Sequence, residues 1–175
     1  MGLRDVILVG HSYGGFVITG VADRVPGRIR HLVYLDTGLP DPGESLMDLL
    51  GNVDAGSGRG NGRSSSRSGR SGTSGGSDRR SGGKIGDSSG GPAHIPDAAP
   101  PYVEKIRYDP ATIRRLKKTY IRCTKSEFLG LTRRSWEKAG AVENGWSRME
   151  LPSSHVPMAD QPQRLYRLML SFASR

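Results

Sequence analysis

The sequence predicts an α/β fold in which a mostly parallel sheet of about four strands is flanked by helices. Two observations lead to this prediction. Short apolar runs alternate with segments that suit helices, both near the N-terminus and near the C-terminus. The strand, helix and strand expected over residues 6–35 also have the spacing of a right-handed parallel crossover.

The N-terminal elements follow from apolar runs and chain breakers. Residues 6–9 are a short apolar run (VILV) that suits a strand buried on both faces. A helix is expected over residues 13–24, because Pro26 and the glycine after it end it. The run HLVYL predicts a second strand over residues 31–35, and one or two helical turns are expected over residues 44–50.

The C-terminal elements begin with a helix expected over residues 109–118, where Asp109 can cap the N-terminus and Pro110 suits the first turn. The last helix has the clearest pattern, since apolar residues recur at i, i+3, i+4 and i+7 from Leu165 to Phe172. The remaining elements are strands over 119–123 and 146–151 and helices over 132–139 and 160–173.

A change in composition separates the two halves. Residues 51–91 contain 14 Gly and 11 Ser, interspersed with Arg and Lys and without an aromatic residue. Such a segment cannot bury enough apolar surface to offset the entropy lost on ordering. We therefore expect residues 51–101 to be disordered, between the two parts of one α/β core, residues 1–50 and 102–175.

The net charge of +9 favours contact with anionic partners. Nucleic-acid binding through residues 51–91 is the weaker interpretation of the basic tract, because the tract has no aromatic side chain on which bases could stack. A solvated linker is favoured.

Cellular location is predicted from two features. Cys123 is the only cysteine, so no intramolecular disulfide can form, which fits a reducing cytoplasm. No apolar run approaches the length of a membrane span, and no signal peptide is recognised. A cytoplasmic protein without a membrane partner is expected, and the sequence carries no signal for a particular number of subunits.

The pentapeptide Gly10-His11-Ser12-Tyr13-Gly14 matches the pattern G-x-S-x-G between the first strand and the first helix. Gly10 and Gly14 allow a sharp turn and close approach of neighbouring elements. Ser12 is then expected at the tip of a strained turn with its hydroxyl exposed, an arrangement called a nucleophile elbow. The start of the helix adds free N–H groups and a positive field beside it.

Four segments resemble the α/β-hydrolase superfamily, and most closely its bacterial esterase-like branch, which is related to plant methyl esterases and hydroxynitrile lyases. They are Leu8–Gly20 (LVGHSYGGFVITG), His31–Pro40 (HLVYLDTGLP), Thr119–Thr124 (TYIRCT) and Leu151–Met158 (LPSSHVPM). The resemblance implies a partial α/β-hydrolase fold. The family has several strands before the elbow, which are not expected among the residues of this sequence, and a helical cap where residues 51–101 stand.

The resemblance also implies a catalytic order of Ser, acid and His. Ser12 is then the nucleophile and His155 the general base, in a segment similar to the family's G-H-x-x-M with Ser154 in place of Gly. A serine hydroxyl needs such a base, because it is a poor nucleophile at neutral pH. The other histidines are weaker candidates, because they lie in the elbow, at a strand start and in the tract expected to be disordered: His11, His31 and His94.

Two residues compete for the acid. Asp36 directly follows an apolar strand and is favoured over Glu127, which follows the strand at 119–123. Asp160 is expected only to cap a helix. The N–H of Tyr13 is expected to be one oxyanion donor, while the family's second donor lies upstream of the elbow, so slow catalysis is expected. Neither a cofactor nor a metal site is expected, since the His residues are scattered and H-E-x-x-H is absent.

Three functional interpretations remain open. The first is a serine hydrolase acting on a small-molecule carboxylic ester, although the same elbow is also consistent with cyanohydrin cleavage. The second is a non-catalytic hydrolase-like fragment whose basic tract binds nucleic acid or other anionic partners. The third is a fragment without independent function. An intact pair of Ser12 and His155 favours the first.

Overall fold

The computed structural model describes residues 2–56, 100–141 and 145–173. All of them belong to one compact unit, which is formed by residues 1–58 and 98–175. Most of the segment expected to be disordered lies outside the described residues. Its disorder, the proposed domain division and binding of nucleic acid through it therefore stay predictions.

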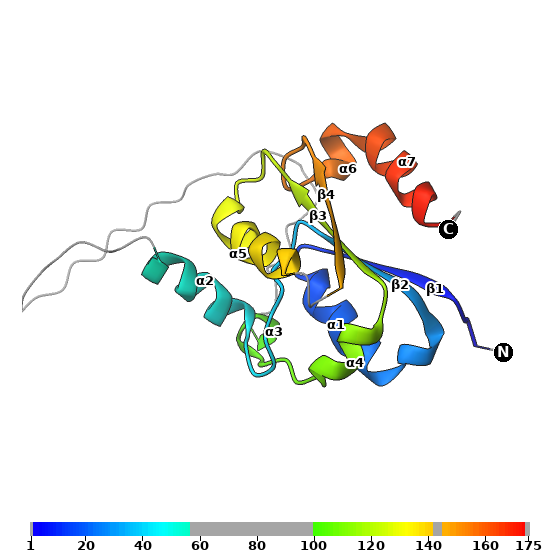
Figure 1. Ribbon diagram of the computed structural model, residues 1–175. Helices are drawn as coiled ribbons and strands as arrows, with labels where there is room; N and C mark the ends of the chain where they lie inside the picture. Colours follow the sequence, from blue (N-terminus) through cyan, green and yellow to red (C-terminus); the bar gives the residue numbers. More distant parts are fainter. Residues whose placement is uncertain (1, 57–99, 142–144, 174–175) are drawn as a thin grey trace, which may run out of the picture. The chain divides into compact units, whose positions relative to one another are not determined.

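Four strands form one parallel sheet in the order β1-β2-β3-β4 (Figure 1). They are β1 (Val6–His11), β2 (Ile29–Leu35), β3 (Lys118–Cys123) and β4 (Trp146–Leu151). β2 is an interior strand, and its residues Leu32–Leu35 are at most 2% exposed. Within the described residues β1 lies at one edge of the sheet, where Val9 is 42% exposed. The predicted parallel sheet of four strands with flanking helices is confirmed.

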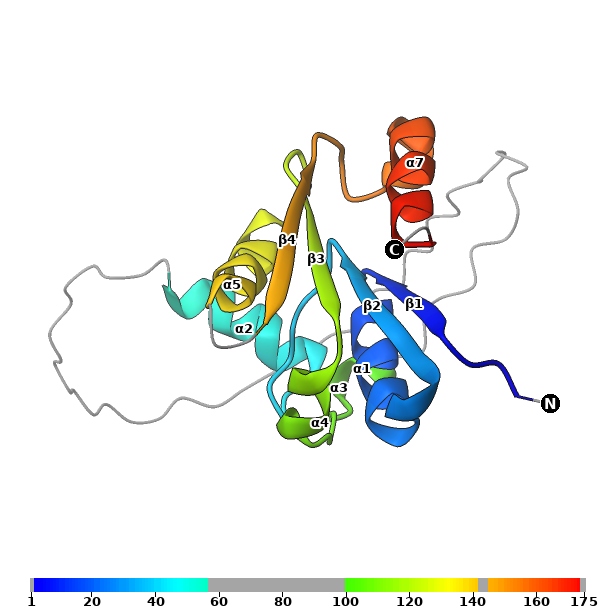
Figure 2. The ribbon, with the colours of Figure 1, turned by 45° about the vertical axis from the view of Figure 1, so that its right-hand side comes forward.

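Helices cover both faces of this sheet (Figure 2). On one face, α1 (Gly14–Arg24), α4 (Pro110–Arg115) and α5 (Leu129–Gly140) pack against a cluster around Leu32, Tyr34 and Tyr120. On the other face, α7 (Pro162–Ala173) packs against Val33, Leu35 and Ile121. The other helical segments are η1 (Pro26–Arg28), α2 (Leu46–Gly56), α3 (Pro100–Val103) and α6 (Pro157–Asp160). Over the described ranges, none of the helices has the length and apolar character needed to cross a membrane.

The helix predicted over residues 109–118 is wrong at its C-terminal end. α4 stops at Arg115, and Lys118 instead begins β3, where it pairs with Leu32 of β2 and is only 4% exposed. Its Nζ donates hydrogen bonds to the carbonyl oxygens of Arg114 and Leu116. Burial, together with the nearby Arg114 charge, lowers the pKa of Lys118. Pairing with β2 therefore overrides the local helical tendency.

The helix predicted over residues 160–173 begins two residues later than expected, as α7. α6 ends at Asp160 and α7 begins at Pro162, because a proline cannot donate the N–H that would continue the first helix. Asp160 was expected to cap the last helix. It lies in α6 instead, and its Oδ2 accepts a hydrogen bond from the N–H of Ser154 at 2.7 Å.

The helix predicted over residues 44–50 also differs, since α2 runs from Leu46 to Gly56 and so enters the range expected to be disordered. Its start is a capping box. The N–H of Asp48 donates to Oγ of Ser45, and the N–H of Ser45 donates to Oδ2 of Asp48.

Candidate active site

Ser12 lies in the sharp turn between β1 and α1, as the G-x-S-x-G pattern predicts. Its φ is 53°, in the left-handed region. That conformation costs a residue with a side chain roughly 1–2 kcal/mol. Its hydroxyl nevertheless reaches a cavity, and α1 begins two residues later, at Gly14. The strained backbone conformation therefore occurs at the residue whose hydroxyl reaches the cavity.

Two glycines allow the chain to pack closely around this turn. A Cβ on Gly10 would lie 2.5 Å from the carbonyl oxygen of Gly14, and a Cβ on Gly15 would collide with the side chain of Thr37. Oγ1 of Thr37 in turn donates a hydrogen bond to the carbonyl oxygen of Ser12. Gly14, which was predicted to allow close approach, has open space where its Cβ would be. Gly15 and Thr37 were missed, because a contact between two elements leaves no local signal in the sequence.

His155 lies in the loop between β4 and α6, and its ring contacts two of the predicted site residues. Nε2 lies 2.9 Å from Oγ of Ser12, and Nδ1 lies 2.8 Å from Oδ2 of Asp36. A carboxylate can only accept, so Nδ1 carries the proton that is donated to Asp36. Nε2 is then free to accept the hydroxyl proton of Ser12. In the neutral imidazole, this tautomer is the one that a general base needs.

Asp36 follows β2 directly and is 1% exposed. Its Oδ1 accepts a hydrogen bond from the N–H of Cys123 at 2.9 Å, while Oδ2 contacts His155. Its own N–H donates to the carbonyl oxygen of Ile121. A buried carboxylate is tolerated when its oxygens are hydrogen-bonded in this way. The favoured acid is therefore the one whose carboxylate contacts the imidazole.

Glu127, the other candidate for the acid, contacts the backbone of His155 and not its ring. Its Oε2 accepts from the N–H of His155 over 3.4 Å, a long hydrogen bond. Phe128, the next residue, lies edge-on to the His155 ring with centroids 4.6 Å apart. Phe128 was not among the residues expected at the site, since a lone aromatic residue after a strand has no periodic pattern.

Tyr13 is the residue between Ser12 and α1, where an oxyanion donor was predicted. Its hydroxyl donates to the carbonyl oxygen of Pro101 at 2.8 Å, and its ring lies edge-on to that of Tyr102. Burial, with a smaller contribution from the Glu104 carboxylate, raises the pKa of Tyr13, so the hydroxyl remains a donor. Tyr13 thereby joins the turn at Ser12 to α3.

A cavity of about 190 Å³ opens beside Ser12 and His155. Most of its wall is apolar or aromatic, and its charged member, Asp36, is turned to the histidine. The wall comes from the turn and β2 end, from α2, α3 and α5, and from the His155 loop: Ser12, Tyr13, Asp36, Thr37, Gly38, Leu46, Leu50, Tyr102, Phe128, Leu131 and His155. The cavity suits a small neutral group.

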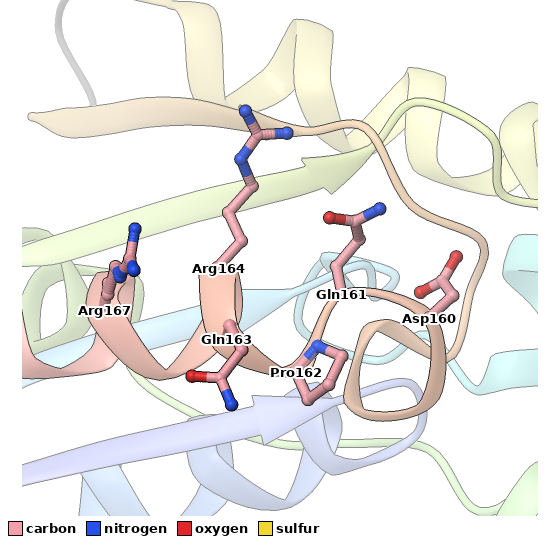
Figure 3. A pocket seen from close by; sticks show the side chains of 6 residues that line it. All are labelled: Asp160, Gln161, Pro162, Gln163, Arg164 and Arg167. Atoms are coloured by element: carbon pink, nitrogen blue, oxygen red, sulfur yellow. The ribbon is translucent and has the colours of Figure 1, made fainter.

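A larger hollow of about 480 Å³ lies at the junction of α6 and α7 (Figure 3). Its lining residues are mostly exposed and of polar or charged type, and they include none of the residues around Ser12: Asp160, Gln161, Pro162, Gln163, Arg164 and Arg167. Arg164 and Arg167 extend from the same face of α7 in this view. Size alone does not identify the site, because of these two cavities the smaller one has Ser12, Asp36 and His155 in its wall.

Two curated relatives match short segments. A carbendazim hydrolyzing esterase from Nocardioides sp. (strain SG-4G) is 71% identical over 48 residues, which is 27% of this chain and 20% of the esterase. A human (lyso)-N-acylphosphatidylethanolamine lipase is 44% identical over 36 residues, 21% of this chain and 10% of the lipase. The match thus spans a fifth or less of each relative's length.

Solved structures share the fold over a longer range. A pyrethroid hydrolase from Sphingobium faniae JZ-2 has a TM-score of 0.63 at 19% identity, covering 99% of this chain and 72% of that chain. An extracellular alpha/beta-hydrolase from a Paenibacillus species has a TM-score of 0.59 at 17% identity, and the match covers 97% of this chain and 72% of that chain. At such identities the likeness concerns the fold alone.

The profile of the Alpha/beta hydrolase family matches residues 2–168. This range includes both parts of the sheet and all three residues that meet at the cavity, Ser12, Asp36 and His155. The resemblance noted in the sequence is therefore confirmed, and the chain belongs to the alpha/beta hydrolase family.

Proposed function

We propose that this protein is a serine hydrolase that acts on small carboxylic esters. The observation that carries the proposal is the hydrogen-bonded series from Ser12 through His155 to Asp36, with distances of 2.9 and 2.8 Å. The 71% identity with an esterase over 48 residues supports the reaction class. The same hydroxyl and imidazole are what acyl transfer to a serine requires.

The proposed mechanism has two stages. Oγ of Ser12 attacks the ester carbonyl while Nε2 of His155 takes the hydroxyl proton, and the Asp36 carboxylate stabilises the resulting imidazolium. The oxyanion is held by the N–H of Tyr13 at the start of α1. The tetrahedral intermediate then expels the alcohol, which takes the proton from His155. Water, activated by the same imidazole, releases the acid and regenerates Ser12.

The rate is expected to be low for the chain tested alone. Among the described residues, one oxyanion donor is assigned, the N–H of Tyr13. Loss of one such donor reduces kcat by about 10²–10³ in a known protease. We therefore expect both acylation and deacylation to be slow, since each passes through an oxyanion.

The substrate is proposed to be neutral and small. The cavity of about 190 Å³ has aliphatic side chains in its wall, from Leu46, Leu50 and Leu131. Its aromatic side chains come from Tyr102 and Phe128. Neither Lys nor Arg lines it, among the residues described, so a negatively charged acyl group would find no counter-ion. Carbendazim is a rational test compound, because the 71%-identical relative is named for its hydrolysis.

The first experiment is labelling with a fluorophosphonate, which phosphonylates an activated serine. We expect labelling of the wild type, and loss of labelling in Ser12→Ala and His155→Ala. Ser171→Ala and His31→Ala are the matched controls, since both residues lie away from the cavity. Folded wild-type protein that takes no label would contradict the proposal.

A cytoplasmic location is also proposed, and the single cysteine supports it. Cys123 is buried as a free thiol, so the described fold does not depend on a disulfide. Fractionation of cells that express the full chain tests this location.

A further inference from the structure

His11 makes a contact with the base that the proposed mechanism does not use. It is the last residue of β1, and its Nε2 lies 2.6 Å from the backbone carbonyl oxygen of His155. The two rings are 4.7 Å apart at their centroids and tilted by 38°. The residue before Ser12 and the residue that contacts its hydroxyl are therefore linked directly.

The contact defines the proton on His11. A carbonyl oxygen can only accept, so Nε2 of His11 must carry a hydrogen and donate it. The backbone N–H of His155 makes a longer hydrogen bond, since it donates to Oε2 of Glu127 over 3.4 Å. His11 thus provides the shorter of the two hydrogen bonds to the backbone of His155.

Such a restraint matters because of where His155 lies. The residue is in a loop, yet its ring must reach Ser12 and Asp36 at the same time. A displacement of about 1 Å at a reacting group reduces rates by about 10²-fold. His11 is anchored in a strand of the sheet, so it ties the loop to the same strand that positions Ser12.

We propose that His11 is a positioning residue, whose Nε2–H holds the backbone of His155 so that the imidazole contacts both Ser12 and Asp36. This inference rests on the proposed function, since it assigns a second histidine to the same site. The imidazole of His11 takes no proton from the substrate or from Ser12 in this scheme. A side chain that donates from a similar position should therefore replace it.

The test compares His11→Leu, which removes the donor, with His11→Gln, whose side-chain amide can donate from a similar distance. We expect His11→Leu to reduce kcat and the fluorophosphonate labelling rate by about 10–10²-fold, with KM nearly unchanged. His11→Gln should recover most of the rate. Circular dichroism and thermal unfolding establish whether both variants are folded. If His11→Leu alone fails to fold, His11→Gln is compared with the wild type.

A second readout does not depend on activity. NMR observes the Nδ1 proton of His155, which is protected from exchange with water while it is bonded to Asp36. We expect this resonance in the wild type and in His11→Gln, and faster exchange in His11→Leu.

The outcomes separate the two proposals. Equal labelling rates and equal exchange in wild type and His11→Leu would overturn the role of His11, as would a folded His11→Gln that is as slow as His11→Leu. Absence of label in the wild type would overturn the proposed function instead, while the exchange of the Nδ1 proton still reports on His11.

Discussion

The backbone N–H of Cys123 donates a hydrogen bond to Oδ1 of Asp36 at 2.9 Å. The donor ends β3 and the acceptor follows β2, so the pairing of two strands orients the carboxylate. The other carboxylate oxygen is then directed to Nδ1 of His155. The geometry of the candidate site thus depends on the register of the sheet.

Replacing each candidate acid separately distinguishes them. Asp36→Asn keeps the shape and suits a φ of 44°, since asparagine tolerates the left-handed region. It should reduce kcat by about 10³–10⁴-fold, because the imidazole loses its orienting carboxylate. Glu127→Gln is the matched control and should change kcat by less than about threefold, because its hydrogen bond is long and to the backbone. Steady-state hydrolysis of p-nitrophenyl acetate measures both, and a larger loss in Glu127→Gln would reverse the assignment.

The strain at Ser12 should appear as a difference in stability. Glycine adopts a positive φ without penalty, so Ser12→Gly should be more stable than Ser12→Ala by about 0.5–1 kcal/mol after its larger unfolded-state entropy is counted. Urea unfolding measures the free energy of each. In the helix α7, Ser171→Gly should instead be less stable than Ser171→Ala. The same sign at both positions would contradict strain at Ser12.

The hydroxyl of Tyr13 should affect substrate binding. Tyr13→Phe removes the hydrogen bond to Pro101 but keeps the backbone N–H, so KM should rise more than kcat falls. Tyr108→Phe is a matched control, because it also removes a hydroxyl that donates to a proline carbonyl, that of Pro40. Each should lower the free energy of unfolding by about 0.5–1.5 kcal/mol. An equal rise of KM in both would show that the effect is one of stability.

The size of the cavity should set the length of the acyl group. Leu131→Ala removes part of the wall contributed by α5, so the preference among p-nitrophenyl esters should move from acetate toward longer acyl chains. Leu168→Ala is the control, since it also truncates a half-buried leucine but lies in α7 on the other face of the sheet. Specificity that moves equally in both variants would exclude the cavity as the acyl site.

Stability should fall at alkaline pH because of the thiol in the core. Burial raises the pKa of Cys123 to about 11 from an ordinary value of 9.0. Below pH 9.0 both the folded and the unfolded chain hold the proton. Between that pH and about 11 only the unfolded chain loses it, so the free energy of unfolding falls as the pH rises.

Urea unfolding of the wild type and of Cys123→Ala, each at about pH 7.5 and pH 10, checks this linkage. The loss between the two pH values should be smaller in Cys123→Ala. Tyr34, whose pKa burial raises to about 12, contributes the same loss to both proteins. An identical loss of unfolding free energy in the two proteins would show that Cys123 does not contribute to this pH dependence.

Local patterns were sufficient for much of the architecture. The apolar run before Ser12, the G-x-S-x-G turn and the strand at residues 31–35 could be located from sequence, because strand burial and turn geometry leave a mark on neighbouring residues. The C-terminal end of α4 was placed wrongly, and the helix that begins at Pro162 was expected to begin at residue 160. The first depends on pairing between Lys118 and Leu32, and the second on a proline inside an otherwise helical pattern.

The sequence by itself determined the fold class, the family and the residues among which a site had to be sought. Only the tertiary structure showed that Asp36 contacts the imidazole of His155 while Glu127 contacts its backbone, and only it linked His11 to His155. The reason is the distance along the chain. Asp36 and His155 are 119 residues apart, and His11 and His155 are 144 apart, so their contacts arise from the order and register of parallel strands and leave no periodic signal.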